Sequence, residues 1–193
     1  MGYVSQWGGM EVGDGMLFSA NVIDGLVHQL GGLQLAINCK FLPTVGTEGE
    51  KCPVGHAVST SPGASELSQH YHTIVHTTPP FYKHHPNPQN FLSQCYQKSI
   101  QESFQSIPNI PTIDKPIKVA IPLLGAGCRA FPLDIAIQIA AEESLRWLHL
   151  EPDGSSKVLA FGIPEMSVAG ELIDTLENIS LSTSFEDDTC GDS

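Results

Sequence analysis

The sequence predicts an α/β sandwich in which helices cover both faces of a largely parallel sheet. Short apolar runs of the kind that buried strands show alternate with longer segments whose apolar residues recur at three- and four-residue intervals. The chain has 193 residues, which suits one domain with a substantial core. In such sheets a ligand binds at the carboxyl end of a strand, in the loop that leads into the next helix. Those strand-to-helix loops are therefore the first places to search for a site.

The first half of the chain predicts one helix and two strands. Residues 21–30 carry a helical stripe of apolar side chains, with Asn21 as a plausible N-cap and Gly31-Gly32 as its end or a kink. The apolar segment 33–42 that follows fits either a helix or a strand. Residues 56–61 and 72–78 alternate in polarity and predict strands.

The second half predicts a regular alternation. A helix is expected over 89–107, a strand over 117–124, a helix over 132–149, a strand over 157–163 and a helix over 165–179. Pro122 favours an edge or an irregular strand end, and Pro132 stands in a first helical turn, where a missing N–H costs nothing. Residues 1–179 are thus expected to form one domain. The Ser/Thr-rich, acidic tail 180–193 is expected to be disordered.

Charge argues against binding to nucleic acid. The net charge is −12, no Lys or Arg follows Lys157, and the first 157 residues hold all nine basic side chains and thirteen of the 21 acidic ones. A nucleic-acid phosphate backbone needs a basic stripe, which this sequence lacks. Any anionic ligand must therefore be held mainly by main-chain N–H groups.

Composition also bears on location and partners. No window approaches 18 consecutive apolar residues and the N-terminus has no signal-peptide pattern, so neither a membrane span nor export is expected. Five scattered cysteines without a close pair favour reduced thiols and a cytoplasmic or nuclear location. A monomer is the expected state, and no cofactor is expected.

The joint between the strand at 117–124 and the helix at 132–149 is the strongest candidate site. It comprises Gly125, Ala126, Gly127, Cys128, Arg129, Ala130 and Phe131. Small residues let a ligand approach the backbone, and successive N–H groups next to a helix N-terminus favour an anion such as a diphosphate. The alternative is a tight turn whose glycines serve the backbone only. The segment matches neither GxGxxG nor a P-loop.

Three segments resemble those of macro domains. Residues 119–148, "VAIPLLGAGCRAFPLDIAIQIAAEESLRWL", resemble the family's second ligand loop and the helix after it. Residues 51–81, "KCPVGHAVSTSPGASELSQHYHTIVHTTPPF", resemble the Cys-Pro-x-Gly-x-Ala segment and a strand ending in His-x-x-x-Pro. Residues 22–32, "VIDGLVHQLGG", are similar to the helix start that follows the first ligand loop. The matches stand in the family's order and cover roughly residues 20–165.

The resemblance implies a three-layer α/β/α sandwich that binds ADP-ribose, free or attached to protein. Some members also hydrolyse mono-ADP-ribosyl esters or O-acetyl-ADP-ribose, so both binding and hydrolysis are expectations. The loop 125–131 would wrap the diphosphate and distal ribose. Asn21, Val22, Ile23 and Asp24 fall where the first ligand loop enters its helix. Asp24 matches the carboxylate proposed to activate a water in hydrolytic members. It equally suits a helix first turn on electrostatic grounds alone.

This sequence departs from the family pattern in two places. Residues 1–20 form an atypical N-terminal segment without the strand and the adenine-reading Asp that macro domains carry there. Arg129 replaces an aromatic residue, where it could pair with phosphate or stay solvated, and Phe131 suits the core better than stacking on a base. These departures keep a second hypothesis open: a non-catalytic scaffold that has lost its ligand and acts in protein contacts.

The eight histidines do not predict a metal site. His70, His72 and His76 share one face of a strand, but same-strand residues four apart lie too far from one another to chelate alone. No HExxH or paired-cysteine pattern is present. We therefore expect no metal, and His76 is interpreted through the family match as a buried strand residue. Cys52 and Cys95 are expected in the core, and Trp147, on the helix after the loop, is expected to serve packing.

Overall fold

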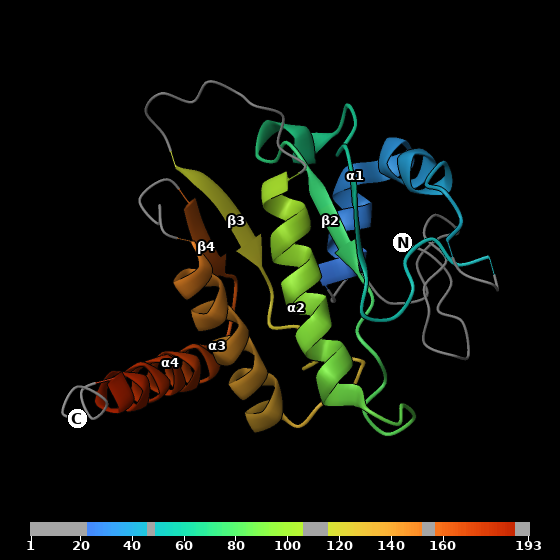
Figure 1. Ribbon diagram of the computed structural model, residues 1–193. Helices are drawn as coiled ribbons and strands as arrows, with labels where there is room; N and C mark the ends of the chain where they lie inside the picture. Colours follow the sequence, from blue (N-terminus) through green and yellow to red (C-terminus); the bar gives the residue numbers. More distant parts are fainter. Residues whose placement is uncertain (1–22, 46–48, 106–115, 152–156, 188–193) are drawn as a thin grey trace.

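The computed structural model describes residues 23–45, 49–105, 116–151 and 157–187. The predicted site residues Asn21 and Val22, together with the segment 1–20, lie outside this part of the chain. The elements run in the order α1 (Ile23–Lys40), β1 (Ala57–Thr60), the 3-10 helix η1 (Glu66–Gln69), β2 (Ile74–Thr77), α2 (Pro88–Gln105), β3 (Ile117–Ile121), α3 (Leu133–Leu150), β4 (Lys157–Phe161) and α4 (Met166–Asp187). Figure 1 shows this course.

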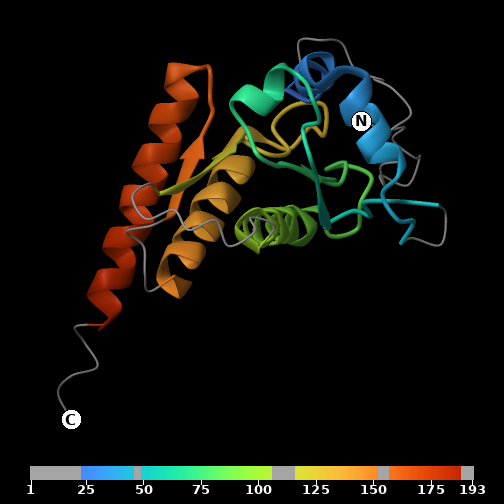
Figure 2. The same ribbon diagram turned by 90° about the horizontal axis from the view of Figure 1, so that it is seen from above.

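The strands form two pairs that share helix α2. β1 and β2 pair antiparallel, with Val58 opposite His76, and β3 and β4 pair parallel, from Ile117 opposite Lys157 to Ile121 opposite Phe161. Helix α2 packs against β1, β2 and β3, so both pairs lie in one layer. In Figure 2, β1 and β2 lie between α1 and α2, whereas β4 runs beside α4 and α3. The predicted α/β sandwich is confirmed, with a mixed arrangement of strands.

Helix α1 resolves the ambiguity at residues 33–42. It continues to Lys40, and Gly32 interrupts it with φ 56° and ψ −155°, so the glycine pair makes a kink and does not end the helix. That backbone conformation is open to glycine at little cost. The buried stripe of the whole helix comprises Gly25, His28, Gly31, Leu35 and Cys39. The turns on both sides of the kink therefore face the same core.

The other elements follow the sequence closely, except at the C-terminus. Helix α3 begins directly after Pro132, as predicted, but β3 ends at Ile121, three residues before the predicted end, because the following Pro122 has no backbone N–H. Helix α4 extends to Asp187, eight residues beyond the predicted end of the last helix at residue 179. No Gly or Pro stands between Gly170 and that end to break the helix. Residues 188–193 are outside the described part.

Two apolar cores lie on either side of the molecule. The larger one joins α2, α3 and α4 to the parallel pair, with Leu92, Tyr96, Phe131 and Leu172 among its buried members. The smaller one gathers Leu35, Cys39, Cys52 and Leu67 beneath α1. Cys52 and Cys95 are fully buried, as predicted. Trp147 packs as predicted too, because its ring stacks on Phe104 with centroids 5.3 Å apart.

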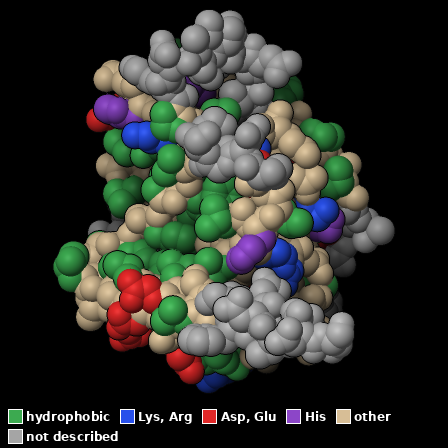
Figure 3. Space-filling view, turned by 60° about the vertical axis from the view of Figure 1, so that its left-hand side comes forward, with side chains coloured by type: hydrophobic (Ala, Val, Ile, Leu, Met, Phe, Trp, Pro, Cys, Tyr) green, Lys and Arg blue, Asp and Glu red, His purple; other side chains and the backbone are tan. Residues whose placement is uncertain are grey.

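One face of the parallel pair is only partly covered by described residues. Lys118, Ala120, Val158 and Ala160 are all exposed, whereas Leu159 and Phe161, which point the other way, pack against the larger core. Figure 3, which brings forward the side where β4, α3 and α4 lie in Figure 1, shows hydrophobic side chains gathered across the middle of the surface.

Among the described helices, none combines the length and apolarity needed to cross a membrane.

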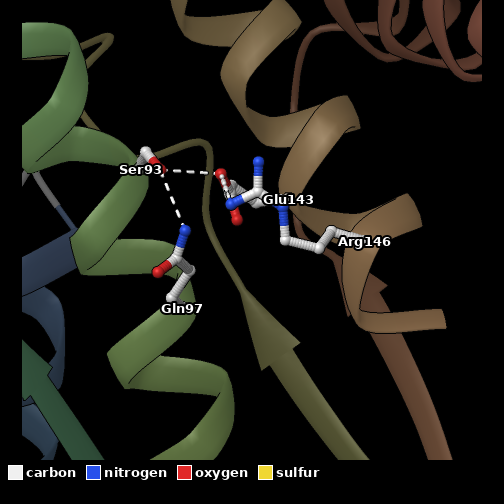
Figure 4. A network of polar contacts seen from close by, with 4 residues as sticks. All are labelled: Ser93, Gln97, Glu143 and Arg146. Carbon is white, nitrogen blue, oxygen red and sulfur yellow. Dashed lines mark hydrogen bonds and ion pairs between the residues drawn. The ribbon is translucent and has the colours of Figure 1, made fainter. Parts of the chain in front are cut away.

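A polar network joins α2 to α3 (Figure 4). The carboxylate of Glu143 is 3% exposed; it accepts a hydrogen bond from Ser93 at 2.7 Å and pairs with Arg146 at 3.2 Å. Gln97 in turn donates to the Ser93 hydroxyl at 3.1 Å. A buried carboxylate is costly unless polar groups surround it, so these contacts at Oε1 offset part of that cost and join the two helices, while Oε2 has no hydrogen-bond partner among the described residues.

Candidate functional site

The loop between β3 and α3 is held at both ends. The N–H of Leu124 donates to the Tyr96 hydroxyl at 2.8 Å, which ties the loop start to helix α2. At the loop end the N–H of Phe131 donates to the carbonyl of Gly125 at 3.1 Å, and the N–H of Ala130 donates to that of Gly127 at 2.9 Å. These bonds close the segment into a compact turn of defined shape.

Gly125 is required by this turn. Its φ is 84°, and a Cβ placed on it would lie 2.9 Å from the ring of Phe131 and 3.2 Å from Leu92. Ala130 adopts φ 57°, the only positive φ of a residue other than glycine in the described chain. Backbone conformations that side chains disfavour gather at functional turns, where the surrounding structure enforces them.

The middle of the loop presents main-chain donors. Within the described residues, the N–H groups of Gly127, Cys128 and Arg129 donate to no protein acceptor, and Gly127 and Cys128 are exposed. A Cβ on Gly127 would meet nothing within 4 Å. Helix α3 follows at once, and its N-cap Pro132 offers no side-chain cap. Unpaired amides beside a helix N-terminus attract an anion.

Arg129 is buried, which excludes the solvated alternative. It is 6% exposed, and its guanidinium lies over the Phe81 ring, 4.3 Å from the centroid. Its carbonyl accepts the N–H of Tyr82 at 3.0 Å, and its Nη1 atom has no hydrogen-bond partner among the described residues. Burial lowers the pKa of Arg129, and the negative charge of Asp24 acts in the opposite direction. A buried cation with a free donor is suited to an anionic ligand.

Asp24 stands in the first turn of α1. Burial raises its pKa from 3.8 to about 6, and the charge of Arg129 partly offsets this rise. The two residues therefore interact, although they are more than a hundred positions apart in the sequence. A carboxylate with a pKa close to neutrality is suited to take up and release a proton.

The remaining predicted residues are dispersed. Ile23 is 47% exposed next to Asp24, and Cys128 is exposed on the loop. Phe131 is 4% exposed and packs against Tyr82 with ring centroids 5.1 Å apart, so its predicted place in the core is confirmed. The charges of Asp24 and Arg129 act on each other's pKa values. It gives no account of Asn21 or Val22, which lie outside the described residues.

Three residues that position the loop escaped the sequence prediction. Tyr96 lies on the buried face of α2, where its hydroxyl also holds Leu124, and Phe81 and Tyr82 support Arg129 from a proline-rich loop. Periodicity locates a side chain on a helix face but does not report the partner of its polar tip. The only available signal was that buried tyrosine hydroxyls usually find a partner.

Comparison with known proteins gives a consistent result. The family model described as "Macro domain" matches residues 14–140. A macro domain-containing protein of Listeria monocytogenes is 28% identical over 147 residues, covering 75% of this chain and 74% of that protein. An O-acetyl-ADP-ribose deacetylase of Enterobacter cloacae is 26% identical over 136 residues, covering 70% of this chain and 68% of that enzyme.

Solved structures show the same fold. The macrodomain of Oceanobacillus iheyensis with ADP superposes with a TM-score of 0.69 at 18% identity, covering 89% of this chain and 83% of that one. A variant of that macrodomain solved with ADPR gives a TM-score of 0.67 at 18% identity, covering 87% and 83%.

Proposed function

The chain belongs to the macro domain family, and from this premise we propose that it binds ADP-ribose, free or attached to protein, with the diphosphate on the loop 125–131. The fold neighbours solved with ADP and ADPR support the choice of ligand. The observation that carries the proposal is the set of three loop amides without a protein acceptor in the described chain, at Gly127, Cys128 and Arg129. The ligand would receive its hydrogen bonds from the backbone, in a protein whose net charge is −12.

Arg129 adds the one buried positive charge that we assign to the site. Its Nη1 donor is unpartnered and its position is fixed by Phe81 and by the Tyr82 amide. A guanidinium held in this way loses little entropy when it meets a phosphate oxygen. We therefore assign Arg129 to the diphosphate or to the ribose beside it.

Hydrolysis of an ADP-ribosyl ester is the finer part of the proposal. The deacetylase relative supports this reaction class, and Asp24 has a pKa of about 6, which suits a general base. In this reaction Asp24 takes a proton from a water molecule as the oxygen of that water attacks the ester. The proton then goes to the leaving oxygen, and ADP-ribose and a carboxylic acid are released.

Calorimetric titration of the full chain with ADP-ribose tests the binding proposal. We expect binding by the wild-type protein and its loss in Gly127→Glu, because a carboxylate would occupy the open space over the loop and repel the diphosphate.

Gly170→Glu is the matched control. Gly170 lies within helix α4 and also has open space around it, so the same change of charge should leave binding intact there. If the folded wild-type protein does not bind millimolar ADP-ribose, the proposal is wrong. Equal binding by the two glutamate variants would place the ligand away from this loop.

A further inference from the structure

Three side chains of metal-ligand type meet beneath helix α1. His28, Cys39 and His76 each offer one ligand atom, and these three atoms all lie within 4.8 Å of one another. The Cys39 sulfur is 3.7 Å from Nε2 of His76. All three residues are buried, with His28 and His76 each 8% exposed and Cys39 fully enclosed.

Long-range packing creates this cluster. His28 and Cys39 are eleven residues apart on the buried stripe of α1, which is close to three helical turns, so both face the same core although Gly32 kinks the helix between them. His76 comes from β2, which pairs with β1 beneath that helix (Figure 1). The sequence analysis grouped His76 with His70 and His72, but the structure places two residues of α1 beside it.

We propose that His28, Cys39 and His76 bind a single transition-metal ion, with Zn²⁺ as the first candidate. Imidazole and thiolate ligands favour zinc, cobalt and copper over magnesium and calcium, which prefer oxygen. Bond lengths of about 2.0–2.3 Å place the ligand atoms of a tetrahedral site about 3.3–3.6 Å apart. The separation of 3.7 Å between the Cys39 sulfur and Nε2 of His76 is close to this range. No pair of ligand atoms is more than 4.8 Å apart, so side-chain rotations that move these atoms by about 1 Å bring all three into range.

The protonation states suit this ion. Burial lowers the pKa of His28 to about 4 and that of His76 to about 3, so both imidazoles are neutral at pH 7 and have a lone pair to donate. Burial raises the pKa of the Cys39 thiol, so the metal must displace one proton as the metal–sulfur bond forms. Binding therefore releases about one proton per ion near neutral pH.

The neighbouring groups balance the charge. Asp24 lies one turn before His28 on α1 and acts electrostatically on Cys39, so a thiolate and this carboxylate together offset the two charges of the ion. Lys51 approaches from the loop, where its ammonium donates to the carbonyl of Lys40. Thr60, on β1, has its hydroxyl 2.9 Å from Nε2 of His76 and supplies an oxygen at the edge of the cluster.

A bound ion would join both halves of the kinked helix to strand β2. It would also fix the helix that carries Asp24. The inference does not depend on ADP-ribose binding, because none of the three ligands belongs to the glycine loop. Without an ion, the same residues form a buried hydrogen-bonded cluster of Cys39, His76 and Thr60, and the experiment must separate these two states.

Cobalt and zinc titration of the tag-free full chain, stripped with a chelator, provides the test. We expect one Co²⁺ per chain, with a thiolate-to-cobalt charge-transfer band and the intense visible bands of four-coordinate cobalt. Zn²⁺ should displace the cobalt and raise the melting temperature. Cys39→Ser should lose the charge-transfer band, and both Cys39→Ser and His28→Gln should weaken zinc binding by about 100-fold or more.

Cys52→Ala is the matched control. Cys52 is buried in the same small core, and its thiol contacts the carbonyls of His56 and His76. Circular dichroism establishes that each variant is folded. The proposal is wrong if folded wild-type protein shows no charge-transfer band in excess Co²⁺. It is also wrong if Cys39→Ser binds zinc as tightly as Cys52→Ala, because the ion would then sit elsewhere.

Discussion

The Tyr96 hydroxyl accepts the backbone N–H of Leu124 at 2.8 Å, so a side chain from the centre of helix α2 holds the start of the glycine loop. Tyr96 itself is fully buried, and its pKa is raised because burial disfavours the phenolate. The loop thus rests on the rigid part of the molecule. A ligand would meet amides that are already in position.

Tyr96→Phe should therefore weaken ligand binding. The variant leaves the Leu124 amide without its acceptor, and we expect a loss of about 1–2 kcal/mol in stability and roughly ten-fold weaker ADP-ribose binding. Chemical denaturation and calorimetry measure the two effects. Tyr71→Phe, at a half-exposed position outside the loop, should change neither. An unchanged affinity in Tyr96→Phe would mean that this bond does not order the loop.

Arg129→Lys should bind ADP-ribose less well than the wild-type protein. A lysine keeps the charge, but it loses the flat guanidinium that stacks on Phe81 and carries the free Nη1 donor. We expect about ten-fold weaker binding at both low and high salt, because the charge that salt screens is kept. Calorimetry at two salt concentrations is the measurement. Binding as tight as that of the wild-type protein at both would remove Arg129 from the site.

Hydrolysis should depend on the protonation of Asp24. Because its pKa is raised to about 6, the carboxylate is charged above that pH and can act as a base, and the rate should fall as the pH is lowered through 6. The measurement is release of ADP-ribose from a glutamate-modified protein between pH 5 and 8. Asp24→Asn should abolish this release while ligand binding persists. Full activity in a folded Asp24→Asn variant would exclude Asp24 as the base.

The stability of the metal-free protein should fall as the pH drops from 7 to 5. The folded-state pKa values of His28 and His76, about 4 and 3, lie below 6.5, so between these values the unfolded chain binds more protons. Each histidine then costs about 2 kcal/mol at pH 5. Asp24 opposes this, because its raised pKa makes the folded chain take up a proton below pH 6.

Urea unfolding at pH 7 and pH 5 measures this balance. His28→Gln, which does not titrate, should show a clearly smaller difference between the two pH values. A wild-type stability that is equal at both would mean that the two imidazoles lose no more stability than Asp24 gains, so their pKa values are not lowered this far.

The network in Figure 4 predicts a difference between two neighbouring positions of α2. Ser93→Ala removes the hydroxyl that donates to the buried Glu143 carboxylate and should cost about 1–3 kcal/mol in stability. Gln97→Ala removes a contact to Ser93 at the exposed rim and should cost less than about 0.5 kcal/mol. Thermal or urea unfolding compares them. Equal losses would show that Glu143 does not depend on Ser93.

Much of the fold could be predicted because its signals are local. Pro132 lacks a backbone N–H and indicates where α3 begins, whereas the predicted strand ran past Pro122 and β3 ends before it. The spacing of apolar residues in α2 and α3 shows which helix face is buried. The short apolar runs of β3 and β4 likewise indicate buried strands. The loop 125–131 was found for the same reason, since glycines mark a place where the chain must turn sharply.

The sequence did not predict where α4 ends or that Arg129 is buried. Acidic and Ser/Thr-rich composition indicates disorder on average, yet nothing after Gly170 breaks the helix before Asp187. A lone arginine after glycines gives no sign of whether it is solvated. Its burial depends on Phe81 and Tyr82, which lie more than forty residues earlier in the chain.

By itself, the sequence determined the order of the elements, the family and the position of the glycine loop, because each depends on residues close together in the chain. Only the tertiary structure decided which polar groups meet: Tyr96 with Leu124, and His28 with Cys39 and His76. Such contacts form when apolar faces that are distant in the sequence pack together, because the polar side chains next to those faces are then brought close to one another. Local spacing does not encode that.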